Sequence, residues 1–230
     1  MEPCLTYFKG WGLSEQIRWM LSAVFGAGWK NVGLENREQM ETLLNGDKLM
    51  FNQLPLLEIN GKLLVQSQPM VRYVAKVGSL NGKDVDEETL IDMILSNIRD
   101  VRSPVVSYPF SEDKESVKVK ALQLVEKFFP RLEKILKANQ SDHWGFVSSL
   151  SAADILVGEL IHELCSEGGL HLVAAEKVQG EFPALWRVYE GVVSLDNIKA
   201  YLGSNKRYPA PVAGKIGDEY VANVNLVLGR

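Results

Sequence analysis

The stretch 52–67 constrains the fold more than any other part of the chain. Two short apolar runs, 54–59 and 63–65, flank the dipeptide Asn60-Gly61. Asn-Gly between apolar runs predicts a β-hairpin, because both residues accept the positive φ of a type I′ turn.

Both ends of this hairpin carry backbone features that suit a ligand. Pro55 lacks an N–H group, so it belongs at a strand start or at a sheet edge. A cis bond before Pro55 would let the backbone of Leu54 present its N–H and C=O groups to a ligand. Ser67 suits an N-cap, and Pro69 is tolerated in a first helical turn. The free N–H groups of that helix N-terminus predict a site for a carboxylate.

Length and composition exclude several classes of protein. The chain has 230 residues, enough for one large domain or two small ones. A net charge of −4 offers no basic footprint for nucleic acid. The two cysteines, Cys4 and Cys165, form no Cys-x-x-Cys pair, which favours a reducing compartment. The histidines lack metal-ligand spacing, and no apolar run is long enough to span a membrane. We expect a cytoplasmic protein without a bound metal.

The first third of the chain predicts a mixed α/β unit. Cys4–Phe8 is short and rich in β-forming residues, which indicates a first strand. Ser14 can cap a helix, and 29–32 fits a second, parallel strand. Residues 35–44 indicate a surface helix or a turn. With the hairpin and a helix at 68–76, the order is β-α-β-α-β-β-α, which fits a thioredoxin-like domain.

The rest of the chain predicts helices only. Apolar residues recur at helical spacing in several segments. These segments are about 87–107, 114–136 with a kink at Pro130, a helix after the Ser151/Asp154 capping box, 183–192, 195–202 and 216–228. We therefore expect a thioredoxin-like domain over 1–79, a linker over 80–86 and an all-α domain over 87–230.

Residues 53–67 resemble the glutathione-site stretch of the cytosolic glutathione transferases, nearest the alpha class with sigma- and mu-like features. Other motifs resemble the same family in the same order along the chain. They are the linker 81–84, the helix 127–134 that bends at a proline, the capping motif 151–155 and the tail after residue 201. The resemblance spans nearly the whole chain and implies a thioredoxin-like domain followed by an all-helical domain.

The resemblance implies an enzyme that conjugates the thiolate of glutathione, its co-substrate, to hydrophobic electrophiles. By the same resemblance Gln53, Leu54, Gln66 and Ser67 bind glutathione, and Pro55 is the supporting cis-proline. Ser67 and the helix start would hold the γ-glutamyl carboxylate. This role agrees with the carboxylate site expected at that helix N-terminus on physical grounds alone.

Tyr7 ends the predicted first strand beside a glycine-containing loop, where functional residues often lie. The strand pattern alone favours a core tyrosine with a satisfied hydroxyl. The resemblance implies that its hydroxyl donates to the sulfur of glutathione, lowers the pKa of the thiol and so activates the nucleophile. Thr6 and Ser14 are weaker candidates, and Cys4 is interpreted as a buried structural thiol.

Two positions depart from the alpha-class pattern. Leu13 stands where that class usually places an arginine near the sulfur, although sigma and mu members lack it too. Leu44 stands where the class usually supplies a basic residue for the glycine carboxylate of glutathione. Lys48, or less favourably Arg37, is expected to substitute; each is otherwise a solvated charge. Loss of one charge-assisted hydrogen bond costs about 1.5–3 kcal/mol, so we expect weaker glutathione binding than usual.

The resemblance also implies a homodimer with an isologous interface. Asp100 corresponds to the acidic residue that reaches the glutathione of the partner subunit, and Lys127 to a basic residue beside it. Both fit an ordinary charged helix face as well. Phe51 corresponds to the aromatic key that enters a pocket on the neighbour, a typical hot spot. Arg18 corresponds to a first-helix arginine that supports the active-site loop.

The second substrate is expected to bind in an apolar pocket. The candidate residues, for each of which core packing is the alternative, are Phe8, Leu13, Tyr108, Phe110, Val221, Val224 and Leu228. Two other functions stay open. One is a glutathione-dependent isomerase or peroxidase, which uses the same thiolate. The other is a non-catalytic ligand-binding or structural relative on the same fold.

Overall fold

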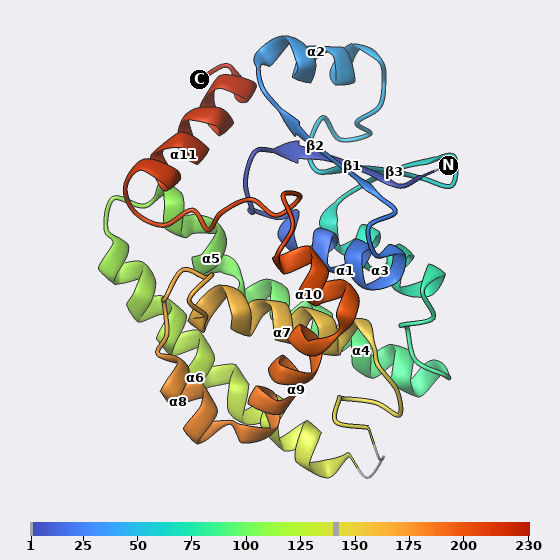
Figure 1. Cartoon of the computed structure of the whole chain (residues 1–230), viewed down its shortest axis with the longest axis vertical. Coiled ribbons are helices and arrows are strands. Elements are labelled where there is room, and N and C mark those ends of the chain that lie inside the picture. Colours follow the sequence, from blue (N-terminus) through green and yellow to red (C-terminus); the bar gives the residue numbers. More distant parts are fainter. Residues whose placement is uncertain (1, 140–142) are drawn as a thin grey trace.

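The computed structural model describes residues 2–139 and 143–230, and Figure 1 shows a small sheet beside a larger group of helices. The four strands lie in the order β2-β1-β3-β4. Their bounds are β1 (Cys4–Phe8), β2 (Lys30–Leu34), β3 (Leu56–Ile59) and β4 (Lys62–Val65). β1 is parallel to β2 and antiparallel to β3, and β3 is antiparallel to β4. The sheet is therefore mixed, and its second strand begins one residue later than expected.

The predicted hairpin is confirmed. β3 and β4 pair from Leu56 opposite Val65 to Ile59 opposite Lys62. Asn60 and Gly61 form the turn with φ values of 49° and 73°, as the positive φ of a type I′ turn requires. The peptide bond before Pro55 is cis, and this proline lies just outside the first residue of β3.

Three helices cover the two faces of the sheet. They are α1 (Glu15–Phe25), α2 (Arg37–Asn45) and α3 (Ser67–Val77). Figure 1 shows α1 and α3 between the sheet and the helical part, and α2 on the opposite side. Because α1 packs against α3, α7 and α10, even its polar residues are buried from Glu15 to Ser22. The thioredoxin-like order β-α-β-α-β-β-α is confirmed.

The described residues after α3 contain helices and loops but no strand. The helices are α4 (Val85–Val101), α5 (Ser103–Ser107), η1 (Tyr108–Phe110), α6 (Lys114–Ala138), α7 (Ala152–Cys165), α8 (Ala175–Glu181), α9 (Pro183–Ser194), α10 (Asp196–Leu202) and α11 (Lys215–Leu228). Every residue of α7 is buried, so the central position expected for it is confirmed. No helix in the described ranges combines the length and apolarity needed to cross a membrane.

Three local expectations differ from the structure. The helix expected over 87–107 divides into α4 and α5, because Pro104 has no N–H group to continue the bonding of α4. Ser14 does not cap α1 with its side chain; its hydroxyl donates to the carbonyl of Trp11 at 3.0 Å. α3 begins at Ser67 itself, and Gln66 is its N-cap residue. α8 is short and lacks a side-chain cap, so no sequence signal marked it.

A second, smaller core lies at the carboxyl end of β1. Tyr7 and Phe8 pack there with Met40 of α2 and with Tyr220 and Val224 of α11. The large core, by contrast, fills the space between α1, α3 and the helices of the second half. α11 contacts α2, β1 and η1, and Figure 1 shows it beside the sheet rather than among the other helices. The last helix of the chain therefore completes the surroundings of the first strand.

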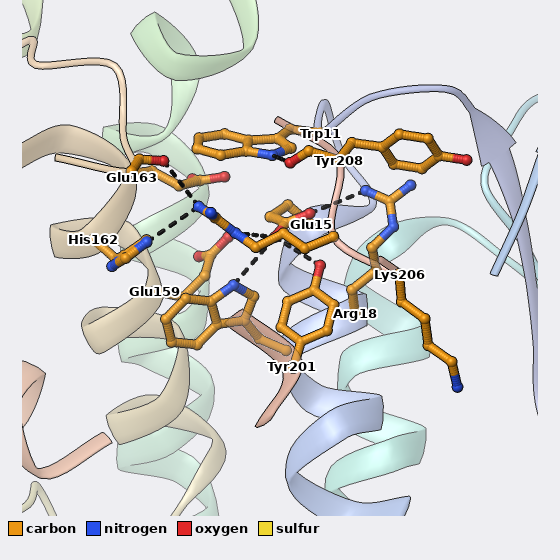
Figure 2. Close-up of polar contacts among 12 residues, drawn as sticks. Trp11, Glu15, Arg18, Glu159, His162, Glu163, Tyr201, Lys206 and Tyr208 are labelled. Atoms are coloured by element: carbon orange, nitrogen blue, oxygen red, sulfur yellow. Dashed lines mark hydrogen bonds and ion pairs between the residues drawn. The ribbon is translucent and has the colours of Figure 1, made fainter. Parts of the chain in front are cut away.

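A buried polar cluster joins α1 to the helical part, as Figure 2 shows. Glu15 accepts hydrogen bonds from Tyr201 Oη at 2.8 Å and from Arg18 Nη1 at 3.0 Å. Arg102, between α4 and α5, is paired with Glu159 and Glu163 of α7. These side chains come from both halves of the chain, so the cluster ties the α/β unit to the helices.

Candidate functional site

A cavity of about 820 Å³ lies where the first turn of α3 faces α4, α5 and η1. Four of the residues predicted to bind a substrate line it: Leu13, Gln66, Ser67 and Phe110. Gln66 and Ser67 follow the hairpin, Leu13 belongs to the loop after β1, and Phe110 ends η1. The fold therefore brings polar groups at a helix N-terminus together with apolar side chains.

Tyr7 lies next to this cavity without lining it. It stands in β1 opposite Gly33 of β2, and its side chain is 6% exposed. Its hydroxyl accepts the N–H of Leu13 at 3.2 Å, and Leu13 is part of the cavity wall. Gly12 makes this contact possible: its φ is +46°, and a Cβ there would lie 2.5 Å from the Tyr7 hydroxyl oxygen.

The surroundings of Tyr7 favour its protonated form. Burial raises the pKa of the Tyr7 phenol, because it disfavours the charged phenolate. The N–H of Leu13, the positive charge of Arg18 and a hydrogen bond with Tyr220 each lower it by a smaller amount. The net shift is upward, so Tyr7 keeps its hydrogen at neutral pH. Chemically, it is a buried O–H donor at the edge of a cavity.

The hairpin residues are gathered at the head of α3. The Gln66 amide donates to Gln53 Oε1 at 3.1 Å, so these two side chains support each other. Ser67 opens α3, whose first N–H groups carry the positive end of the helix dipole. The structure thus brings Gln53 to Gln66, the residue before Ser67, and Gln53 itself precedes the cis peptide bond between Leu54 and Pro55. Gln66 and Ser67 line the cavity, whereas Gln53 and Leu54 do not.

Two glutamines that sequence reasoning did not select connect the Leu13 loop to α3. Gln68 donates to Gln16 Oε1 at 3.4 Å, and Gln16 donates to the carbonyl of Leu13 at 3.1 Å. Both side chains are buried and both line the cavity. Their only sequence signal is a polar residue on the buried face of each helix, and that face becomes known only when α1 meets α3.

The cations expected near the site have other partners. Lys48 Nζ lies 3.0 Å from Glu58 Oε1, and Arg37 pairs with Glu41 at 3.0 Å. Neither lines the cavity, whereas Arg72, Arg99 and Arg102 do. Arg72 is paired with Asp92 of α4. The basic groups next to the cavity therefore come from α3, from α4 and from the residue that follows α4, which the sequence did not indicate.

Arg18 links the loop after β1 to the buried cluster. Its Nη1 atom donates to the carbonyl of Gly10 at 2.8 Å and to Glu15 at 3.0 Å. Its Nε atom donates to Asn31 Oδ1 at 3.2 Å, and its guanidinium lies 4.9 Å from the centre of the Tyr208 ring. Arg18 therefore contacts the loop that carries Leu13 but does not line the cavity.

The other apolar candidates lie outside the cavity wall. Phe8 and Val224 belong to the second core, and Val221 and Leu228 are half-buried on α11. Tyr108 is buried, and its carbonyl accepts from Lys114 Nζ at 2.6 Å. Leu13 and Phe110 are therefore the two predicted electrophile-pocket residues that line the 820 Å³ cavity.

Three residues predicted to meet a partner subunit are exposed in the described chain. Phe51 is 56% exposed, beside Met50 at 75%. Asp100 and Lys127 are exposed on α4 and α6, and Lys127 Nζ lies 4.8 Å from the centre of the Phe128 ring.

A second cavity, of about 660 Å³, lies between α3 and α4. No group of three His, Cys, Asp or Glu residues suited to a metal ion occurs in residues 2–139 and 143–230.

The fold and the site together define a class of protein: a thioredoxin-like unit joined to a helical unit, with a cavity between them at the head of α3. Two family models match this chain. The N-terminal domain of glutathione S-transferase matches residues 3–76, and the C-terminal domain matches residues 99–205. The chain belongs to the glutathione S-transferase family.

Individual relatives agree with this assignment. Glutathione S-transferase 3 of Gallus gallus is 37% identical over 235 residues, which covers 99% of this chain and 95% of the relative. Glutathione S-transferase alpha I of Oryctolagus cuniculus is 33% identical over 213 residues, covering 90% of this chain and 92% of the relative. The crystal structure of the glutathione S-transferase from Ascaris lumbricoides aligns with a TM-score of 0.71 at 30% identity, covering 88% of this chain and 96% of that one.

Proposed function

We propose that this protein is a glutathione transferase, in which the Tyr7 hydroxyl stabilises the thiolate of glutathione for attack on a hydrophobic electrophile. The observation that carries the proposal is the position of Tyr7. It is a buried, protonated hydroxyl held by the Leu13 N–H at the wall of the cavity. A hydrogen bond to the charged sulfur favours the thiolate, which is the nucleophilic form.

In this proposal the head of α3 binds the γ-glutamyl end of glutathione. Ser67 and the first N–H groups of α3 hold its carboxylate, and Gln66 with Gln53 borders the peptide. The backbone of Leu54 completes the site beside Pro55. Lys48 is the proposed partner of the glycine carboxylate, and it would have to exchange its bond with Glu58 to reach it.

The electrophile is proposed to bind against Leu13 and Phe110, the apolar part of the cavity wall. The other candidates are proposed to pack behind the cavity wall and so to influence its shape. They are Phe8, Tyr108, Val221, Val224 and Leu228. Conjugation is preferred over isomerase or peroxidase activity, and over a non-catalytic role, because the curated relatives reported above are named transferases.

We further propose a homodimer in the cytoplasm. Phe51 is the key that enters the partner, and Asp100 and Lys127 face the glutathione of the partner. Exposed Met50 and Phe51, and the cavity between α3 and α4, support a paired surface. Both cysteines are free thiols, which suits a reducing compartment. The domain bounds 1–79, 80–86 and 87–230 belong to the same proposal.

An ultraviolet difference titration of bound glutathione tests the role of Tyr7. The wild type should show thiolate absorbance at neutral pH. Tyr7→Phe should raise the pKa of the bound thiol by roughly one to two units, because one hydrogen bond to a charged group is lost. Glutathione bound without thiolate in the wild type would contradict catalysis, and no binding at all would contradict the proposed ligand.

A further inference from the structure

Tyr220 of α11 brings a second phenol to Tyr7. A Cβ atom at Gly12 would lie 2.5 Å from the hydroxyl oxygen of Tyr7 and 2.7 Å from that of Tyr220. The two hydroxyls therefore converge on Gly12, which has no side chain to keep them apart. Tyr220 is 5% exposed, and its ring centre lies 5.7 Å from that of Phe110, which lines the cavity.

The position of Tyr220 is held by the rest of α11. Asn223, less than one turn further along, accepts the N–H of Lys9 at 2.8 Å and donates to the carbonyl of Leu34 at 2.9 Å. Those two backbone groups adjoin the ends of β1 and β2. Gly10 leaves the space for the Tyr220 ring, since a Cβ there would lie 2.2 Å from Tyr220 Cδ2. The helix is thus docked on the same strand that carries Tyr7.

The hydrogen-bond capacity of Tyr7 shows what a second hydroxyl can do. A phenol oxygen offers one hydrogen to donate and two lone pairs to accept. The N–H of Leu13 takes one lone pair. Burial raises the pKa of both phenols, whereas their mutual hydrogen bond lowers the pKa of Tyr7 and raises that of Tyr220 further. The second lone pair of the Tyr7 oxygen is open to a donor, and the Tyr220 hydroxyl, which converges on the same point of the loop, has the hydrogen to fill it.

We propose that Tyr220 is a positioning residue for this reaction: its hydroxyl donates to the Tyr7 oxygen and leaves the Tyr7 hydrogen for the sulfur of glutathione. This inference rests on the proposed function of Tyr7. An oxygen that accepts a hydrogen bond becomes a stronger donor through its own O–H. Leu13 carries no charge that could act on the sulfur. In this proposal the Tyr220 hydroxyl acts on the thiolate only through its hydrogen bond to Tyr7.

The test is the thiol titration of glutathione bound to the full chain of four proteins: wild type, Tyr220→Phe, Tyr7→Phe and the double variant. Tyr220→Phe keeps the ring but removes the hydroxyl, and it should raise the thiol pKa by roughly 0.5–1 unit. The double variant should match Tyr7→Phe alone, because Tyr220 acts through Tyr7. Asn225→Ala, an exposed site on the same helix, is the matched control and should leave the pKa unchanged.

The outcomes separate this inference from the proposed function. If glutathione bound to Tyr7→Phe is still a thiolate at neutral pH, the proposed role of Tyr7 fails, and this inference fails with it. If Tyr7→Phe loses thiolate but Tyr220→Phe has an unchanged or a lower thiol pKa, this inference alone is overturned. Additive shifts in the double variant would also overturn it. Gly10→Ala, which displaces the Tyr220 ring while Tyr220 itself is kept, should reproduce the shift if Tyr220→Phe folds poorly.

Discussion

At the scale of single residues, Gly12 decides whether two hydroxyls can meet at one point of the loop. A methyl group there would lie 2.5 Å from Tyr7 Oη and 2.7 Å from Tyr220 Oη. The φ of +46° adds backbone strain for any other residue. We therefore expect Gly12→Ala to lower kcat/KM for glutathione conjugation at least about tenfold, equivalent to roughly 1.4 kcal/mol.

Gly61→Ala is the matched control for this steady-state measurement. Gly61 also has a positive φ, of +73°, but a Cβ there would meet nothing within 4 Å. The Gly61→Ala variant should therefore lose stability through backbone strain but keep its activity per folded molecule. Equal loss of kcat/KM in the two variants would show that strain, and not the crowding of the hydroxyls, is responsible.

At the scale of elements, Asp154 holds the start of α7 to the loop before it. Its carboxylate accepts the N–H of Ser151 at 2.8 Å, the Ser151 hydroxyl at 2.7 Å and the N–H of Phe146 at 2.8 Å. All of these groups are buried. Since bonds to a charged acceptor are worth about 1.5–3 kcal/mol each, Asp154→Ala should lower the free energy of unfolding by about 3 kcal/mol or more.

Denaturant unfolding measures this loss, and Ser151→Ala is the variant for comparison. It removes the cap hydroxyl but leaves the carboxylate bonded to both backbone N–H groups, so a loss of about 1 kcal/mol is expected. A loss in Asp154→Ala no greater than in Ser151→Ala would show that the loop does not depend on the carboxylate.

At the scale of the whole molecule, the exposed Phe51 is predicted to hold two copies together. An aromatic hot spot contributes about 2 kcal/mol or more, so Phe51→Ser should weaken dimerisation at least about thirtyfold. Analytical ultracentrifugation across a dilution series measures this. Val119→Ser, an equally exposed apolar site on α6, should not change the association. A wild type that stays monomeric at every concentration would refute the prediction.

The buried ion pairs of Arg102 with Glu159 and Glu163 are expected to make the stability of the whole protein depend on pH. Burial raises the pKa values of Glu159 and Glu163, and the Arg102 charge opposes that rise. Arg102→Leu leaves two buried carboxylates without a cation, which typically costs 3–5 kcal/mol. We expect a loss of about that size at pH 8, measured by denaturant unfolding.

The sign of the pH dependence follows from those raised pKa values. Without Arg102 the folded variant binds protons on Glu159 and Glu163 at a pH where the unfolded carboxyls, with ordinary pKa values, do not. Its stability deficit should therefore shrink as the pH falls from 8 to 5. Adding Glu159→Gln and Glu163→Gln should remove most of this pH dependence. A deficit that stays constant with pH would contradict the assignment.

Local features were predicted well because their causes are local. The Asn60-Gly61 turn, the Ser151/Asp154 capping box and the amphipathic segments each depend on residues a few positions apart. The division of the helix at Pro104 has a local cause as well, the missing N–H group, although apolar spacing by itself predicts one continuous helix. The family resemblance extended this local evidence to Tyr7, Gln66 and Ser67, whose positions the structure brings to one cavity edge or next to it.

By itself, the sequence determined the hairpin, the order of the elements and the family to which the chain belongs. Only the tertiary structure decided which distant groups meet. Asn223 bonds to Lys9 across 214 positions, Gln68 reaches Gln16 across 52, and Lys48 lies against Glu58 rather than free. The physical reason is that spacing along the chain shows which face of a helix is apolar but not what packs against it. Tyr220 meets Tyr7 because α11 docks on β1, and that contact exists only in the folded chain.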